Sequence, residues 1–138
     1  MNKQTTAGYK EVPHTADWEL HIWAGDLIGL LVQAAKGMYA LADTQLAEGV
    51  RLERSFTIEF SDYETLLVRF LSELLYYGEV EQIAFDSFQL AIKDEILHAH
   101  LKGAPIVSQV KEIKAVTYHR IEVRETQAGL EVNIVFDV

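Results

Sequence analysis

This sequence of 138 residues contains no cysteine and no long apolar run. The absence of cysteine excludes disulfide bonds, thiolate nucleophiles and cysteine-ligated metal sites, and it is compatible with a cytoplasmic protein. A membrane-spanning helix needs about 20 consecutive apolar residues, and no segment approaches that length. The segment 1–6 also lacks the apolar stretch of a signal peptide. We therefore expect a cytoplasmic protein that does not contact membranes.

Basic side chains are also few, with 12 lysines and arginines against 21 acidic residues and a formal net charge of −9. An acidic surface repels phosphate, so this composition argues against independent binding of nucleic acid. Complementary charge speeds the encounter of two proteins. The composition therefore favours a protein partner with a basic surface.

The length and an apolar content of 49% predict one domain, residues 1–138, with a substantial core. Two segments carry apolar residues at helical spacing. We expect the first helix to begin after Asp26 as its N-cap and to end near Asp43. We expect the second helix to begin at a capping box made by Ser61 and Glu64, and to end at Gly78.

The remaining apolar residues alternate with polar ones, which is typical of strands. We expect a loop at 103–105, and strands at 9–12, 18–24, 51–60, 83–92, 95–101, 113–124 and 130–136. The last two of these strands should form a hairpin. Because strand pairs interleave with helices, the sequence predicts an α+β fold: two helices packed on one face of a mixed β-sheet, a single two-layer domain with an additional hairpin.

Two acidic positions close to the chain ends are the strongest candidates for function. Asp17 lies in the turn His14–Asp17 between two predicted strands, and Asp137 is followed only by Val138, which adds a carboxylate of its own. Carboxylate oxygens suit a hard cation such as calcium, magnesium or manganese. On the residues alone, the simpler interpretations are preferred: Asp17 as a turn residue that bonds its own backbone, and Asp137 as part of a solvated strand end.

Four short segments, in this order and at this spacing, resemble the archease family. They are His14-Thr15-Ala16-Asp17, the apolar helix 66–75, the segment 112–119 with Ile113-Lys114-Ala115 at its centre, and the terminal Asp137-Val138. A single tetrapeptide would carry little weight. Four segments in the family's order, in a chain of matching length, make the resemblance specific over nearly the whole sequence.

The resemblance implies an accessory protein and not a free-standing enzyme. Archeases assist the RtcB-type RNA ligase, which uses GTP and a divalent metal to join a 3′-phosphate or 2′,3′-cyclic phosphate to a 5′-hydroxyl RNA end. The accessory protein promotes guanylylation of the ligase and supports multiple turnover. The implied partner is therefore this ligase, in tRNA splicing or RNA repair, with RNA contacted only indirectly through the ligase.

The resemblance also implies roles for particular residues. Asp17, Asp137 and Val138 match the positions of the family's metal site, which is associated with calcium, with magnesium or manganese as alternatives. Lys114 matches the lysine of the family's Ile-Lys-Ala motif, a further functional position that we assign to ligase activation. We interpret His14 as a residue that orients this site from outside the ligand set. On the residues alone, Lys114 is also compatible with an ordinary surface charge.

One region departs from the family pattern, and three histidines are left open. The segment 103–111 is shorter than in many members, so a partner contact made there by other members is in doubt. His98 and His100 share one face of a predicted strand, a spacing that can bind metal, but no third ligand is evident nearby. We interpret them as part of an exposed polar face, and the sequence does not place His119 toward the site or toward solvent.

Two other functions compete with ligase activation. One is a small metal-dependent hydrolase that uses Asp17 and Asp137, with His14 as the base. A site with two carboxylates and no evident nucleophile suits positioning better than chemistry. The other is a chaperone-like binding module, which nothing in the sequence requires.

Overall fold

The computed structural model describes residues 6–13 and 18–138, which form two helices and nine strands. The helices are α1 (Leu27–Leu41) and α2 (Tyr63–Val80). The strands are β1 (Gly8–Val12), β2 (Trp18–Ala24), β3 (Gln45–Leu46), β4 (Leu52–Glu59), β5 (Ile83–Lys93), β6 (Ile96–Ser108), β7 (Ala115–Val116), β8 (Arg124–Thr126) and β9 (Gly129–Asp137).

The strands form two sheets, and the α+β class with two packed helices is confirmed. In the first sheet the order is β1-β2-β9-β7, with β8 also paired to β9; in the second, β6 pairs with β3, β4 and β5. The strand pairs are antiparallel. The long central strands β9 and β6 therefore organise one sheet each.

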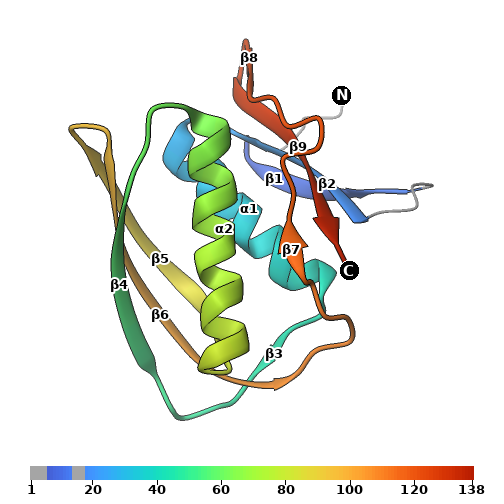
Figure 1. Cartoon of the computed structure of the whole chain (residues 1–138), viewed down its shortest axis with the longest axis vertical. Coiled ribbons are helices and arrows are strands. Elements are labelled where there is room, and N and C mark those ends of the chain that lie inside the picture. The colour runs from blue at the N-terminus through green and yellow to red at the C-terminus, as the bar shows by residue number, and fades with distance from the viewer. Residues whose placement is uncertain (1–5, 14–17) are drawn as a thin grey trace.

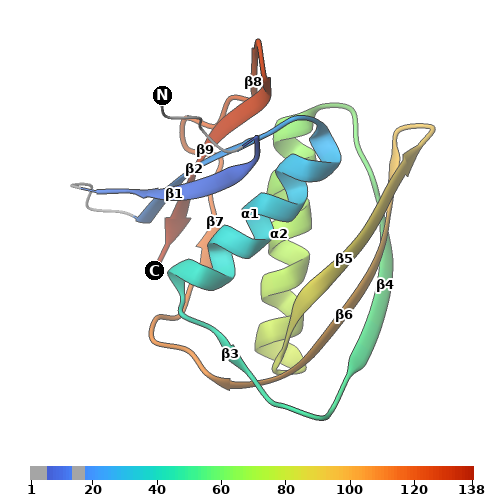
Figure 2. The same cartoon turned by 180° about the vertical axis from the view of Figure 1, so that it is seen from behind.

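The two helices cross each other between the sheets. Figure 1 shows α2 in front, with β4, β5 and β6 on one side and β7 and β9 on the other, and Figure 2 shows α1 on the opposite side. Both helices bury one face in a common core that also takes side chains from both sheets. Its largest fully buried members include Leu20, Ile22, Leu30, Leu31, Met38, Ile58, Leu66, Leu67, Phe70, Leu71, Phe85 and Phe136.

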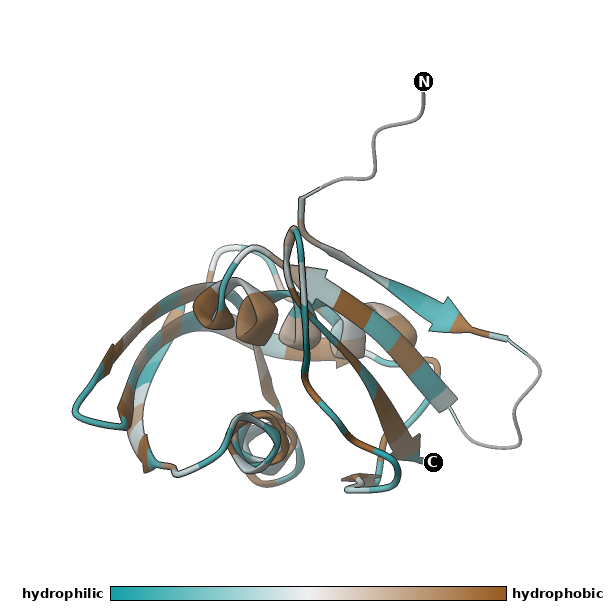
Figure 3. Ribbon diagram, turned by 90° about the horizontal axis from the view of Figure 1, so that it is seen from above, coloured by the Kyte–Doolittle hydropathy of each residue, from teal (hydrophilic) through white to brown (hydrophobic). Residues whose placement is uncertain are grey.

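The alternating pattern of β2 places its apolar residues inward, as predicted. Leu20, Ile22 and Ala24 are buried, whereas His21 and Trp23 are half-buried on the outer face. Bands of brown and teal follow one another along this strand in Figure 3. Because side chains alternate between the two faces of a strand, this register fixes which residues meet the helices.

The helix starts agree with the sequence in one case and differ in the other. The Asp26 carboxylate accepts a 2.8 Å bond from the Gly29 amide and caps α1, as predicted. The prediction of Ser61 as the cap of α2 was wrong: Asp62 accepts from the Thr65 amide at 2.7 Å. An ionised carboxylate is the stronger acceptor at a helix N-terminus, so the residue after the serine takes the position.

The second helix and β6 run further than predicted. Gly78 does not end α2, which continues for two residues to Val80. The loop expected at 103–105 is instead part of β6, because the pairing with β5 continues through it as far as Pro105. A side chain at Gly103 would lie 1.9 Å from the Ala84 carbonyl oxygen, so glycine here permits close packing of two strands beside an irregularity in β5.

The hairpin predicted for 113–124 and 130–136 was only partly right. From this part of the chain only β7 and β8 pair with β9, at its opposite ends, and residues 117–123 between them belong to no strand. In this segment, the Val123 amide donates a 2.7 Å bond to the carboxylate of Glu64 in the first turn of α2. Glu64 thus takes the place of a strand partner and ties the segment to the helix.

The structure contains no helix that is both long and apolar enough to span a bilayer among the residues it describes.

Candidate functional site

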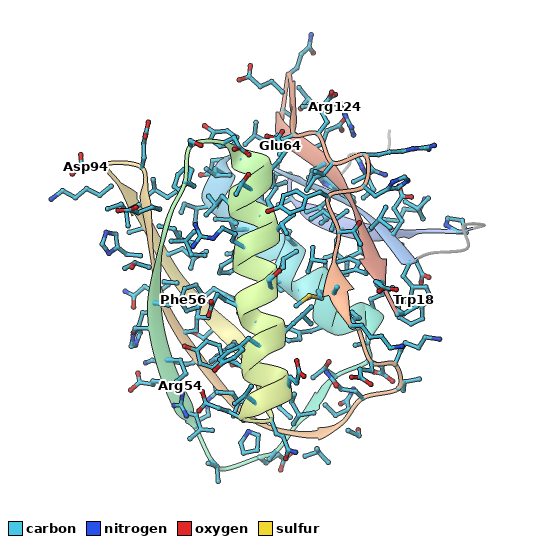
Figure 4. The ribbon with its side chains drawn as sticks, viewed as in Figure 1. Trp18, Arg54, Phe56, Glu64, Asp94 and Arg124 are labelled. Atoms are coloured by element: carbon cyan, nitrogen blue, oxygen red, sulfur yellow. The ribbon has the colours of Figure 1, made fainter. Side chains whose placement is uncertain are left out.

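The C-terminal end of β9 is where the segments that carry the predicted site residues meet. Phe136 pairs with Trp18 of β2 on one side and with Val116 of β7 on the other, and Asp137 pairs with Ala115. Figure 4 shows Trp18 beside this end of β9. The site therefore draws on residues that are more than 110 positions apart in sequence, brought together because β9 pairs with both β2 and β7.

Lys114 lies directly beside Asp137 at the end of the first sheet. Its main-chain N–H donates a 2.8 Å hydrogen bond to the Asp137 carbonyl oxygen. Both side chains are exposed, and neither forms an ion pair with another residue in the parts of the chain described, 6–13 and 18–138. The backbone thus holds the pair in place and leaves the ammonium and carboxylate groups available to an external ligand.

The Val138 side chain packs against the hydrophobic core. Because a chain end is ordered when it is tied down, this contact restrains the last residue next to Asp137. The structure therefore places Asp137, Val138 and Lys114 together at one end of the first sheet.

The other two predicted site residues, His14 and Asp17, lie outside the described residues. Trp18, which follows Asp17 in the chain, is the pairing partner of Phe136, which precedes Asp137. Among the described residues, no group of three or more histidine, aspartate or glutamate side chains is arranged to hold a metal ion. The oxygen donors of Asp137 and Val138 fit a hard cation by their chemistry, but the described residues supply only these two.

A second lysine lies near the same end of β9, and no sequence pattern predicts it. The Lys111 ammonium lies over the Trp18 ring, 5.0 Å from its centroid, in a cation–π arrangement. The main-chain amides of Lys111 and Val110 both donate to the Ala42 carbonyl oxygen, at 3.3 and 2.9 Å. These bonds anchor the segment 106–114 to the C-terminal end of α1.

A cavity of about 560 Å³ adjoins the site, bounded by the C-terminal ends of α1 and α2 and the segment 106–114. We call it the helix-end cavity. Its apolar wall includes Met38, Leu74, Leu75 and Ile113, and its polar groups include Glu79, Gln109, Glu112 and Lys114. Lys114 therefore belongs to both the cavity and the end of β9.

Tyr39 also lines the helix-end cavity. Its hydroxyl oxygen is buried and has no hydrogen-bond partner of good geometry among the described residues, although the main chain of Phe85 lies near it. Burial raises the pKa of Tyr39, because the phenolate would lose its hydration.

The three histidines left open by the sequence lie away from this end of β9 or face solvent. His100 and Ser55 are cross-strand partners on the second sheet, and the His100 ring is hydrogen-bonded to Ser55 Oγ at 2.7 Å and to Glu53 at 3.1 Å. His98 is exposed on the same strand, as expected for a polar face. His119 is exposed in the segment 117–123, where its amide donates to Thr117 Oγ1.

Comparisons with known proteins match the fold and the sequence over nearly the whole chain. The model of the archease protein family (MTH1598/TM1083) matches residues 9–138. A protein archease of Methanosarcina mazei is 32% identical over 142 residues, which cover 94% of this chain and 95% of the relative. A protein archease of Methanothermobacter thermautotrophicus is 29% identical over 139 residues, which cover 95% and 99% of the two chains.

Two solved structures share the fold. The crystal structure of a Thermotoga maritima archease, described as a possible chaperone, superposes with a TM-score of 0.70 at 21% identity and covers 94% of this chain and 96% of its own. The solution structure of Methanobacterium thermoautotrophicum protein 1598 gives a TM-score of 0.70 at 26% identity, with 95% and 99% coverage.

Proposed function

Since the chain belongs to the archease family, we propose that it activates an RtcB-type RNA ligase by promoting guanylylation of that enzyme. The ligase joins 3′-phosphate and 5′-hydroxyl RNA ends, in tRNA splicing or RNA repair. The observation that carries the proposal is the junction at the end of β9, where Asp137, Val138 and Lys114 adjoin the start of β2.

The junction is suited to act on a partner because it combines a fixed backbone with unpaired charged groups. The strand pairing and the Lys114–Asp137 bond hold the main chain, whereas the Lys114 ammonium and the Asp137 carboxylate have no ion-pair partner within residues 6–13 and 18–138. Preorganised charges aimed at a reacting group lower the barrier for charge development there. A guanylyl transfer places negative charge on phosphate oxygens, and a lysine is a suitable group to meet it.

The proposed metal ligands are Asp137, a main-chain oxygen of Val138, and Asp17 from the segment that leads into β2. A bound calcium ion, or magnesium or manganese in its place, would supply positive charge that holds these oxygens together. The role of the chain itself is to bring the donors to one end of a strand. His14 is proposed to orient this group from outside it.

The partner is proposed to meet this acidic chain with a basic surface. The net charge of −9 favours encounter with such a surface, and added salt should weaken the complex because it screens the charges. RNA is proposed to be contacted only by the ligase, since the acidic surface does not favour phosphate.

The direct test is a guanylylation assay of the cognate ligase with labelled GTP, with and without this protein. We expect faster formation of the ligase–guanylate adduct and more ligation events per ligase molecule when the protein is added. A heat-denatured sample of the same protein is the control. Equal rates with native and denatured protein would contradict the proposal.

A further inference from the structure

We propose that the helix-end cavity receives an arginine side chain from the basic surface of the ligase, and that this contact docks the ligase beside Lys114. The inference rests on the proposed function and adds to it a place and a chemistry for the contact. It comes from the cavity itself, where Lys114 is the one predicted site residue among the described residues that line the wall.

The cavity is large enough to admit a long side chain, and part of its wall is apolar. Its volume of about 560 Å³ falls within the range of about 300–1,000 Å³ that is typical of ligand pockets. Met38, Leu74 and Ile113 contribute apolar surface, along which the aliphatic part of an arginine can pack.

The charged groups at the cavity favour a cationic head group. Glu79 and Glu112 are exposed, and neither forms a hydrogen bond or ion pair through its side chain with the residues that the structure describes. Glu79, Glu112 and Lys114 together carry a net charge of −1, so the cavity has a negative net charge. A guanidinium offers five N–H donors in a planar fork, which suits two carboxylates better than the single point charge of an ammonium does.

Gly78 keeps the space open. A Cβ built at Gly78 would meet its nearest neighbours, Ile106 Cδ1 and the Ile83 carbonyl oxygen, at 3.7 and 3.8 Å, which is ordinary contact. Neither backbone strain nor crowding therefore requires glycine at this helical position, where alanine would be more favourable by about 0.5–1 kcal/mol. The missing side chain leaves room for a guest.

The segment 106–114 adds an apolar surface beside the cavity. Val107 and Val110 are 66% and 77% exposed, although both are aliphatic. The bonds from Val110 and Lys111 to Ala42 hold this surface in place. A protein that inserts an arginine into the cavity would cover these valines, and it would lie next to Lys114 and the end of β9.

The first experiment measures ligase affinity and guanylylation for matched variants. The double variant Glu79→Lys/Glu112→Lys should weaken ligase binding at least tenfold more than Glu122→Lys/Glu125→Lys, which makes the same change of net charge on exposed residues outside the cavity. Gly78→Leu should obstruct part of the cavity and weaken binding, whereas Gly78→Ala should bind like the wild-type protein. Thermal unfolding of each variant checks that the fold is kept.

The outcomes separate this inference from the proposed function. If the wild-type protein activates the ligase and the cavity variants bind as well as their controls, the docking inference is overturned and ligase activation stands. If the wild-type protein neither binds nor activates the ligase, both fail.

A second measurement tests the chemistry of the guest without the ligase. N-acetyl-arginine methylamide at millimolar concentration should shift the amide NMR signals of residues 106–114, and Glu79→Gln/Glu112→Gln should abolish the shifts. N-acetyl-norleucine methylamide, which lacks the guanidinium, should produce none. Equal shifts with both compounds would overturn the assignment of an arginine and indicate a purely apolar guest.

Discussion

The main-chain N–H of Lys114 is hydrogen-bonded to the carbonyl oxygen of Asp137 at 2.8 Å. This bond extends the pairing of β7 with the last residues of β9, so it ties the predicted activating lysine to a predicted metal ligand through the backbone. Replacing the Lys114 side chain leaves the bond intact. The function of the ammonium group is therefore separable from the architecture of the site.

Lys114→Ala should lower the rate of ligase guanylylation by about tenfold or more, because it removes the positive charge that we propose to meet the reacting phosphate. Complex formation should change by less than about twofold, since one exposed charge contributes little to affinity. Both quantities are measured on the same preparation, with Lys93→Ala in the β5–β6 hairpin as the control. Equal losses in binding and guanylylation would make Lys114 an ordinary interface contact.

Asp137→Asn should weaken binding of calcium by at least about tenfold, because the site loses one of its charged oxygen ligands. Terbium offers a convenient stand-in for calcium, since its luminescence is excited through a nearby tryptophan, and Trp18 is the cross-strand partner of Phe136. Asp17→Asn should have a similar effect. Asp94→Asn, at the tip of the β5–β6 hairpin, is the control. Terbium luminescence that is unchanged by Asp137→Asn would exclude this metal site.

Extending the chain beyond Val138 with a short flexible tag should abolish ligase activation and leave the fold intact. The packing of β9 depends on Val132, Ile134 and Phe136, which the tag does not alter. The same tag placed before Met1 is the control, and the thermal midpoint of both proteins verifies the fold. Full activation by the protein extended after Val138 would show that the chain end has no role.

The sequence predicts those helices and strands that are specified by local patterns within their own segments. Both helices and the alternation of β2 follow from local periodicity, and the Asp26 cap follows from side-chain chemistry next to an apolar run. The path of residues 117–123 could not be predicted from local sequence. It depends on Glu64, a residue more than 50 positions away that replaces a strand partner. The division into two sheets is equally non-local, because it depends on which strands find partners.

The candidate site likewise contains residues that the sequence predicted and contacts that depend on the fold. Motif resemblance predicted Asp137, Val138 and Lys114, and the structure places them together. The contact of Lys111 with Trp18 could not be foreseen, since the two residues are joined only by the pairing of β2 with β9 and the course of the 106–114 segment. The helix-end cavity likewise forms where three separate segments meet, and the pattern of each segment alone does not predict that meeting.

Asp62→Ala should destabilise the protein more than Ser61→Ala, because Asp62 is the residue that caps α2. We expect the thermal midpoint to fall by about 3–6 °C for Asp62→Ala and hardly at all for Ser61→Ala. The bonds from the Thr65 amide and hydroxyl lower the pKa of Asp62, so its contribution is present at neutral pH and lost as acid protonates the carboxylate. Thermal unfolding at neutral and acidic pH tests both statements. A larger fall in the thermal midpoint for Ser61→Ala would show that Ser61 caps α2 after all.

Tyr39→Phe should leave the protein as stable as before or raise its free energy of unfolding, by up to about 1–2 kcal/mol, because it removes a buried hydroxyl that has no partner of good geometry within residues 6–13 and 18–138. Burial raises the pKa of Tyr39, so above a pH of about 10 its phenol ionises in the unfolded chain before it does so in the folded one. The stability of the wild-type protein should therefore decline with rising pH in this range, and Tyr39→Phe should lessen the decline. Denaturant unfolding from neutral pH to about pH 11 measures it, with Tyr118→Phe as the exposed control. A clear loss of stability in Tyr39→Phe at neutral pH would instead show that the hydroxyl is bound in solution, with the nearby Phe85 main chain as its partner.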